Sequence, residues 1–329
     1  MRNDCWWGLA VFVILASIVL TSCHTPTDGM PTTNTYWDLN IVQVDGSGHK
    51  ILAHGGWEAL PTDSAIIFAG DNFSLFIVKY DGSNLTQLYP SILWGDHALS
   101  PNGEKVLLAS GSFESSGYLS ELYLMDPDGT NLVKLAPAKG WYAWPRISPD
   151  LHEVVFFRDG GIATINTDGT SLQHVKRKTD STHCLYGVYI DENDIVYFED
   201  ANSLSCIRLF NRTNREDRLI GSLSAGFPAF GRVLVGSNLL FADLDTIKIL
   251  NVYTSALSRV GLGFYASFSS DVSKIVGSDG RSIYIMDSDG TNQETIYTEV
   301  DSEKSISFPQ FSPDGRFIVF QTAWTVRVF

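Results

Sequence analysis

Aspartate pairs in a repeated tight turn are the residues whose type and spacing could do chemistry. The segment Leu122–Leu135 reads LYLMDPDGTNLVKL, and the segment Ile283–Ile296 reads IYIMDSDGTNQETI. Each of these turns offers two carboxylates, whereas the related turns at Gly46 and Gly82 offer one. A calcium loop needs several oxygen ligands from one segment, with a later bidentate carboxylate. The pattern therefore favours a hairpin corner, in which Asp accepts backbone N–H bonds and Gly takes a positive φ, over a metal site.

The same turn recurs along the chain, which makes it part of an internal repeat. Its glycines are Gly46, Gly82, Gly129, Gly169 and Gly290. The long interval before Gly290 holds two degenerate turns, FNRTN at Phe210–Asn214 and NVYTS at Asn251–Ser255, each after an apolar run. The pattern indicates a unit of roughly 40 residues that occurs seven times.

A second turn, of the type Ser-Pro-Asp-Gly, alternates with the first and also separates two short apolar runs. Its clearest copies are Ala98–Ala109, Ile147–Phe157, Phe268–Gly277 and Phe311–Phe320. Each unit therefore offers four strands. Runs such as VVFF and FIVF are apolar at consecutive positions, which suits strands covered on both faces. Four-stranded sheets stacked face to face around an axis provide that environment.

These two interleaved patterns resemble the WD-repeat-like units of TolB-like β-propellers, which occur in many bacterial lipoproteins. The resemblance covers roughly Trp37 to Gln321. It implies an all-β fold, a single β-propeller of seven four-stranded blades, with six or eight blades left open by the weak fifth unit. The segment from His24 to Thr35 leaves no room for the N-terminal α/β domain of TolB itself.

The two ends of the repeat region are complementary. Leu39–Ala53 supplies only an outer pair of strands, and Phe308–Gln321 supplies only an inner pair. A sheet edge left open invites association, so we expect the two ends to complete one blade. Thr322–Phe329 reads as one more strand, with no place assigned to it.

The N-terminal segment differs in composition from the rest of the chain. Residues 1–22 carry Arg2 and then an apolar run that is short for a membrane span, as in a signal peptide. The run ends in Leu-Thr-Ser-Cys, which resembles the bacterial lipobox and implies lipidation of Cys23 by several acyl chains. Residues 23–36 then form a flexible tether, and residues 37–329 form the propeller. An uncleaved anchor and an ordinary secretory signal are the alternatives.

Two cysteines remain for a disulfide after removal of the signal and lipidation. Cys184 and Cys206 fall on the first and third strands of one sheet in this interpretation, about 9–10 Å apart. A disulfide requires Cα atoms within roughly 7 Å, so a bridge is not favoured.

The overall charge limits the kind of partner. The formal net charge is −14, with 37 Asp and Glu against 23 Lys and Arg. Nucleic-acid binding depends on clustered cations, so nucleic acid is excluded as a partner. We expect a monomer with no cofactor, bound to a membrane through Cys23.

The connections between predicted blades carry the residues of greatest functional interest. Each leads from an outermost strand to the next innermost strand and lines one mouth of the central channel. Aromatic rings with a few polar groups suit protein or sugar recognition, although each ring could instead pack between blades. The candidate ligand-binding rim is Trp57, Trp94, His97, Trp141, Tyr142, Trp144, Arg146, His183, Tyr186 and Tyr265.

Catalytic motifs are scarce in this sequence. There is no G-x-S-x-G elbow and no hydrolase domain after the propeller, so no catalytic residue is assigned. His54, His97 and His183 could instead meet around the channel and hold a metal, as in metal-dependent oligogalacturonate lyases. We expect a non-catalytic lipoprotein of the bacterial envelope, most simply at the outer membrane facing the periplasm or the cell surface. Its ligand would be a protein partner or an envelope polymer. A carbohydrate-active metal lyase is the alternative.

Overall fold

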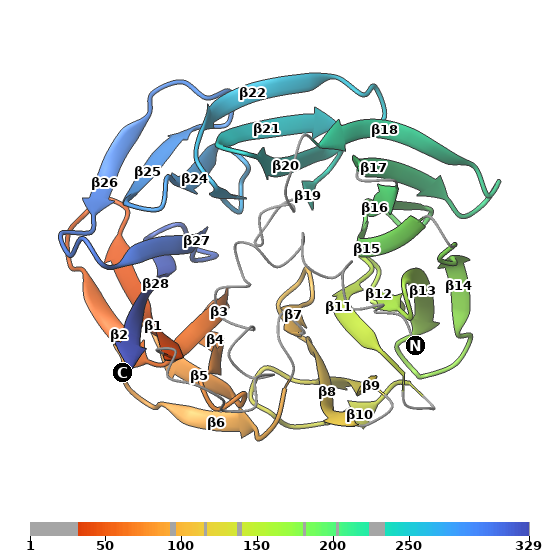
Figure 1. The fold of residues 1–329 in the computed structure, drawn as a ribbon, viewed down its shortest axis with the longest axis horizontal. Coiled ribbons are helices and arrows are strands. Elements are labelled where there is room, and N and C mark those ends of the chain that lie inside the picture. Colours follow the sequence, from red (N-terminus) through yellow and green to blue (C-terminus); the bar gives the residue numbers. More distant parts are fainter. Residues whose placement is uncertain are drawn as a thin grey trace.

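The computed structural model describes residues 32–92, 97–114, 117–136, 140–179, 182–201, 204–223 and 234–328. These residues form seven antiparallel sheets of four strands each, arranged as a ring (Figure 1). No helix long and apolar enough to cross a bilayer occurs within those ranges. The all-β, seven-bladed propeller predicted from the repeat is therefore confirmed. The expected signal peptide and Cys23 lie outside the described residues.

Six blades are built from consecutive strands, here given from the innermost strand outward. Blade 1 consists of β3 (Gly56–Pro61), β4 (Ala65–Gly70), β5 (Leu75–Lys79) and β6 (Thr86–Tyr89), and blade 2 of β7 (His97–Leu99), β8 (Val106–Glu114), β9 (Gly117–Met125) and β10 (Val133–Lys134). Blade 3 consists of β11 (Tyr142–Ile147), β12 (Glu153–Arg158), β13 (Gly161–Asn166) and β14 (Gln173–Lys176), and blade 4 of β15 (Thr182–Tyr189), β16 (Asp194–Ala201), β17 (Leu204–Asn211) and β18 (Asp217–Leu223). Blade 5 consists of β19 (Leu234–Val235), β20 (Asn238–Asp243), β21 (Thr246–Asn251) and β22 (Leu257–Leu262), and blade 6 of β23 (Tyr265–Phe268), β24 (Lys274–Ser278), β25 (Ser282–Asp287) and β26 (Glu294–Thr298).

The seventh, closing blade joins the two ends of the chain. Its strands, from the inside outward, are β27 (Ser305–Phe311), β28 (Phe317–Val328), β1 (Thr32–Gln43) and β2 (Lys50–His54). In Figure 1 the red and orange first strands lie beside the blue last strands. The inner pair comes from the C-terminal end and the outer pair from the N-terminal end, as the sequence predicts.

Strands β1 and β28 extend beyond the rest of the closing blade. They pair along their whole length, whereas β2 pairs with β1 only at residues 38–41. β1 begins at Thr32, inside the segment expected to be a tether, because β28 extends equally far and supplies its partner. Tyr36 and Trp324 stack across this extension with ring centroids 5.7 Å apart. The last predicted strand is therefore the end of β28, and the paired ends form a two-stranded ribbon.

Hydrophobic contacts between neighbouring blades form the core. In β12, Val154 and Phe156 pack toward blade 2, whereas Val155 packs against Cys184 and Tyr189 of blade 4. Each of these strands is covered on both faces, which explains the consecutive apolar residues. The face where one blade's outermost strand connects to the next innermost strand is called the mouth face below.

Candidate functional site

Three aromatic residues of the predicted rim are buried in the blades. Trp57, Tyr142 and Tyr186 are at most 6% exposed. The indole N–H of Trp57 donates to the carbonyl of Gly70 at 3.1 Å. These three side chains therefore stabilise the packing and are left out of the exposed surface.

Three further rim residues offer little or no described surface. Trp94 lies outside the described residues. His183 belongs to β15, where the structure describes its backbone only. Tyr265 is partly buried, with its ring centroid 4.5 Å from that of Phe308. Burial raises the pKa of the Tyr265 hydroxyl.

Two tryptophans remain at the mouth end of blade 3. Trp141 is 44% exposed, and its ring meets the buried ring of Phe157 edge-on with centroids 4.9 Å apart. Trp144 meets the same ring edge-on at 5.5 Å. Trp141 thus presents a firmly supported aromatic surface to solvent.

Bulges in the innermost strands decide which rim side chains are buried. The pairing register shifts next to Glu58 in β3, Trp144 in β11 and Phe308 in β27. These three residues have φ values of 48°, 50° and 51°, a conformation that is uncommon for residues other than Gly. The recurrence in three blades shows that the bulge is a regular feature of this ring.

The predicted polar rim residues form a wall along blades 1 to 4, in two pairs that each join neighbouring blades. Arg146 donates from Nε to the Tyr186 hydroxyl at 2.9 Å, and its guanidinium lies 4.9 Å from the centre of that ring. His97 Nε2 lies 2.7 Å from the carbonyl oxygen of Glu58. Innermost strands of four successive blades, β3, β7, β11 and β15, thereby contribute to this wall.

His97 is held as a neutral imidazole. Its side chain is 1% exposed, and Nδ1 lies 3.7 Å from Glu58 Oε2. Burial, with a smaller contribution from the charge of Arg146, lowers the pKa of His97 to about 4, although the hydrogen bond to Glu58 opposes the shift. The buried Nδ1 has no hydrogen-bond partner. His97 is therefore part of the wall rather than an exposed recognition group.

Of the three histidines considered for a metal, His54 and His97 have described side chains, and these two do not meet. His54 ends β2, the outermost strand of the closing blade, and its Nδ1 lies 2.6 Å from Asp38 Oδ1. His97, on the innermost strand of blade 2, faces Glu58 of blade 1. Within the described ranges no three His, Cys, Asp or Glu side chains are grouped as metal ligands. His54 lies on the outermost strand of its blade, a position that does not favour the alternative of a channel metal held by these histidines.

A cluster of cations that sequence reasoning missed lies beside Trp141. Asp159 accepts the backbone N–H of Trp141 at 3.3 Å and faces Arg158 Nε at 3.6 Å. A side chain at Gly160 would meet the stem of Lys178 at 2.6 Å, so Lys178 lies over this hairpin. The exposed Arg177 precedes it. We call Arg158, Arg177 and Lys178 the cationic edge.

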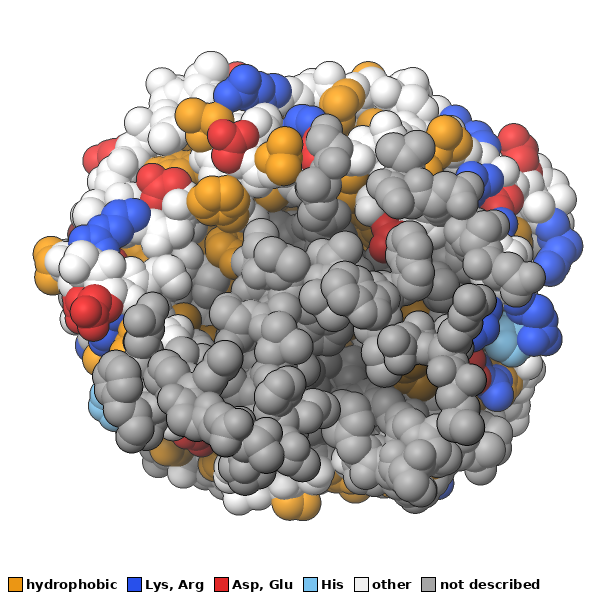
Figure 2. Space-filling view, in the orientation of Figure 1, with side chains coloured by type: hydrophobic (Ala, Val, Ile, Leu, Met, Phe, Trp, Pro, Cys, Tyr) orange, Lys and Arg blue, Asp and Glu red, His pale blue; other side chains and the backbone are white. Residues whose placement is uncertain are grey.

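Figure 2 shows Lys, Arg and His side chains gathered over β14, at the right of the view. His174 of β14 has its pKa lowered by burial and then by Arg177 and Arg158. The Nε of Arg158 and the Nδ1 of His174 are buried without a hydrogen-bond partner. The run KRK at residues 176–178 was the available signal in the sequence. Lys176 itself is paired with Asp217 at 2.8 Å and so adds little free charge.

The aspartate turns prove to be hairpin corners held by the chain's own donors. The Asp before each Gly accepts the backbone N–H two residues later at 2.8–2.9 Å, in the turns of Asp45, Asp81, Asp128, Asp168 and Asp289. The following glycines have φ values between 81° and 87°. Only glycine adopts this conformation readily, which explains the repeated Asp-Gly pair.

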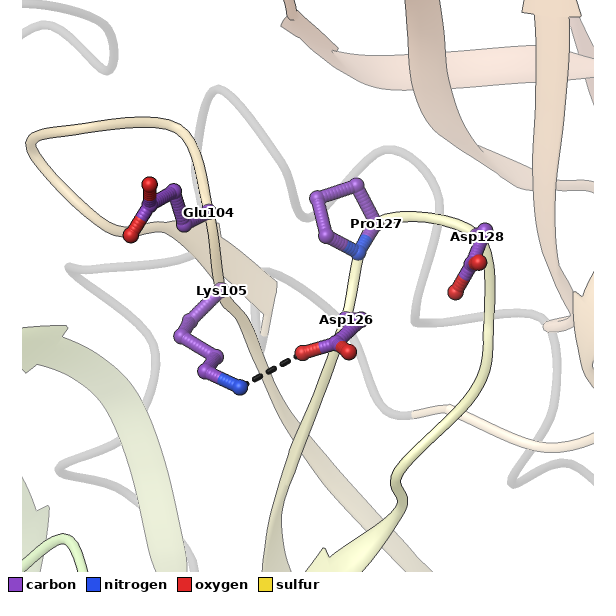
Figure 3. Close-up of a pocket in the computed structure, with 5 residues that line it drawn as sticks. All are labelled: Glu104, Lys105, Asp126, Pro127 and Asp128. Atoms are coloured by element: carbon purple, nitrogen blue, oxygen red, sulfur yellow. Dashed lines mark hydrogen bonds and ion pairs between the residues drawn. The ribbon is translucent and has the colours of Figure 1, made fainter.

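A surface hollow at one of these corners is lined by Glu104, Lys105, Asp126, Pro127 and Asp128. In Figure 3 the Lys105 ammonium and the Asp126 carboxylate face each other, and their separation is 2.5 Å. Asn131 donates to the other oxygen of Asp126 at 2.6 Å. Because both oxygens of Asp126 accept hydrogen bonds from within the chain, this carboxylate stabilises the turn.

The comparisons with known proteins show the fold. No protein-family model matches the sequence, and no curated protein matches it either. The structure is similar to an oligogalacturonate lyase in complex with manganese, with a TM-score of 0.56 at 14% identity over 84% of this chain and 80% of that one. It is also similar to a puromycin-hydrolysing peptidase from Mycobacterium tuberculosis, with a TM-score of 0.58 at 15% identity over 78% of this chain and 49% of that one.

TolB from Acinetobacter baumannii also matches, with a TM-score of 0.48 at 16% identity over 88% of this chain and 64% of that one. All of these identities are too low to indicate a shared activity. The chain has the fold of a seven-bladed β-propeller.

Proposed function

We propose that this protein is a lipid-anchored protein of the bacterial envelope whose propeller is a non-catalytic binding module. Its ligand is a protein partner or an envelope polymer, bound on the mouth face. Trp141 beside the cationic edge is the observation that carries the proposal. The module stays at the outer membrane, facing the periplasm or the cell surface, through acyl chains on Cys23.

The chemistry of this edge suits a ligand with acidic groups on a flat or apolar frame. A rigid exposed indole buries contact area at small entropic cost. Guanidinium and ammonium groups within the same edge bind carboxylate or phosphate oxygens. In a chain with net charge −14, such a local surplus of cations is a departure from the surrounding surface.

The test compares capture of envelope components by purified protein and by two variants. We expect Trp141→Ala combined with Arg177→Ala and Lys178→Ala to lose capture at least about tenfold, as expected for a central aromatic and two charges. Leu85→Ala with Arg316→Ala, at exposed positions on the opposite face, is the control. An unchanged set of captured molecules in the first variant would overturn the proposed site.

The anchor has its own test. Mass spectrometry of the mature N-terminal peptide should show a diacylated or triacylated Cys23, and Cys23→Ala should abolish membrane retention. A mature chain that starts elsewhere, or an unmodified Cys23, would remove the anchor from the proposal.

A metal-dependent lyase remains the alternative function. The likeness to oligogalacturonate lyase concerns the fold, and the described histidines do not converge. Elemental analysis of purified protein separates the two ideas. A stoichiometric, tightly held Mn, Ca or Zn would overturn the non-catalytic proposal.

A further inference from the structure

Bulky apolar side chains protrude from the mouth face along three adjacent blades. They come from blades 5 and 6 and the closing blade, at the top and left of Figure 1. Each is at least 42% exposed, and Val300 is 90% exposed. We call these residues the apolar arc: Leu244, Leu262, Phe264, Val300, Tyr36 and Val326.

The topology places all of them on one face. Leu244 lies in the turn between β20 and β21, and Leu262 and Phe264 flank the connection from β22 to β23. Val300 lies between β26 and β27. Connections from outermost to innermost strands define the mouth face. Tyr36 and Val326 belong to the ribbon, which extends from the same end of the closing blade as the connection from β2 to β3.

Backbone hydrogen bonds hold the first half of the arc in place. The N–H of Gly263 donates to the carbonyl of Asp245 at 2.7 Å, which ties the Leu244 turn to the next connection. The N–H of Phe264 donates to Ser278 at 2.9 Å. The exposure of Leu262 and Phe264 is therefore fixed by the structure around them.

Side chains hold the second half. Arg281 donates to the carbonyls of Val300 and Asp301 at 3.3 and 2.6 Å, so the loop that exposes Val300 is clamped. Further along, Lys304 Nζ lies 4.4 Å from the centre of the Trp324 ring and 3.3 Å from Asp38 Oδ2. Contacts within the chain thus hold both the Val300 loop and the ribbon.

The ribbon is also where the chain enters the propeller. Only residues 24–31 separate it from Cys23, and eight residues span at most about 30 Å when extended. An acyl anchor at Cys23 keeps this end of the mouth face close to the bilayer. Tyr and Trp with a neighbouring Lys are the residues that proteins place at the membrane interface.

We infer that the apolar arc is a membrane-contact surface, on which the anchored propeller rests against the lipid bilayer. This inference rests on the proposed lipid anchor. Acidic residues accompany the cations along the arc, among them Asp245, Asp279, Asp301 and Glu303. Contact is therefore made by apolar insertion and is insensitive to salt and to anionic lipid.

A propeller that rests on the apolar arc leaves Trp141 and the cationic edge free to bind a ligand. Blade 3 lies across the ring from blade 6 and the closing blade (Figure 1). A propeller tilted onto one side of its mouth face keeps Trp141 and the cationic edge open to a ligand.

The test places spin labels on the acylated full-length protein in phosphatidylcholine vesicles. Labels at Phe264→Cys and Val300→Cys probe the arc, and labels at Leu85→Cys and Leu132→Cys are controls on the opposite face, where the native residues are also exposed. All four carry Cys206→Ser, and the buried Cys184 is retained. Collisions with lipid-soluble oxygen and with a water-soluble nickel complex are then compared.

We expect oxygen collisions to dominate at 264 and 300 and nickel collisions to dominate at 85 and 132, with no change at high salt. Nickel dominance at 264 and 300 in protein whose Cys23 is acylated would overturn the membrane contact and leave the anchor intact. If mass spectrometry shows an unmodified Cys23, the anchor fails on its own. In that case, bilayer-immersed labels at 264 and 300 still support the arc, and water-exposed labels overturn it.

Discussion

His97 of blade 2 binds the backbone carbonyl of Glu58 in blade 1, with 2.7 Å between Nε2 and the oxygen, while its other ring nitrogen is buried without a hydrogen-bond partner. Two neighbouring blades are thereby joined through an imidazole that must stay neutral. Protonation would place a charge in a site that is closed to water and near Arg146.

His97 should make the fold sensitive to acid. Its pKa is about 4 in the folded protein and 6.5 when solvated, so the unfolded state binds more protons between these values. The contribution of neutral His97 to the free energy of unfolding is fully present above pH 6.5. It is lost as the pH drops toward 4, by about 3 kcal/mol in total. Urea unfolding of His97→Gln across pH 4–8 should lack this component.

The exposed His152 provides the matched control, since His152→Gln removes an imidazole at the surface. If His97→Gln and wild type lose stability in parallel as the pH falls, the neutral-imidazole account is wrong.

Burial should divide the predicted rim tryptophans into two classes. Trp57 is 5% exposed, and truncating a buried aromatic costs about 3–5 kcal/mol, so Trp57→Ala should lower the free energy of unfolding by that amount. Trp141→Ala should cost about 1 kcal/mol or less, because the ring is 44% exposed. Denaturant titrations measure both, and equal losses would contradict the assignment of Trp141 to the surface.

The aspartate turns should not bind calcium, so calcium should leave the melting temperature unchanged. Asp126 accepts hydrogen bonds from Lys105 and Asn131, which lower its pKa in that order. Asp287 has the same partners in Lys274 and Asn292. Melting temperatures with calcium and with chelator should coincide, and Asp126→Asn should lower the melting temperature slightly. A calcium-dependent rise that Asp126→Asn abolishes would establish a metal site.

Cys184 and Cys206 should remain unbridged. Both lie opposite Glu199, on either side of β16, so a full strand separates them. Burial raises the pKa of the Cys184 thiol to about 12. Iodoacetamide should therefore modify Cys184 only after unfolding. A peptide map of the oxidised protein showing a Cys184–Cys206 crosslink would refute this arrangement.

Buried residues where the two chain ends pair in the closing blade should contribute strongly to the free energy of unfolding. Leu39 of β1 is fully buried at the seam, and Leu39→Ala should cost about 2–5 kcal/mol. Leu85→Ala, at a 55% exposed position, should stay within about 0.5 kcal/mol of wild type. Chemical denaturation of the pair would reject a stabilising seam if the two losses were alike.

The repeat predicts most of the fold because its signals are local. Asp-Gly corners, Ser-Pro-Asp-Gly turns and doubly apolar strands each require only neighbouring residues. The closure of the ring follows from counting strand pairs, and the positions of Cys184 and Cys206 follow from the strand order.

The sequence does not reveal which rim side chains are exposed, because strand bulges change which face a side chain occupies. The register shift in β3 follows Trp57, whereas the corresponding shift in β11 follows Ala143. The bulge has the same place in both strands, but Trp57 precedes it and Trp144 lies within it, so the two rings have different surroundings. Phe264 stands in a connection that the sequence singles out, but its exposure depends on blades on both sides.

The ribbon of β1 and β28 has a consequence for biogenesis. β1 meets its partner β28 only after the strands of the other six blades have been translated, so the ring cannot close before then. Such distant pairing makes folding slow and leaves an unpaired edge open to aggregation in the meantime. Loss of β28 alone would leave the strands of the other six blades in place and yet expose the edges of both β1 and β27.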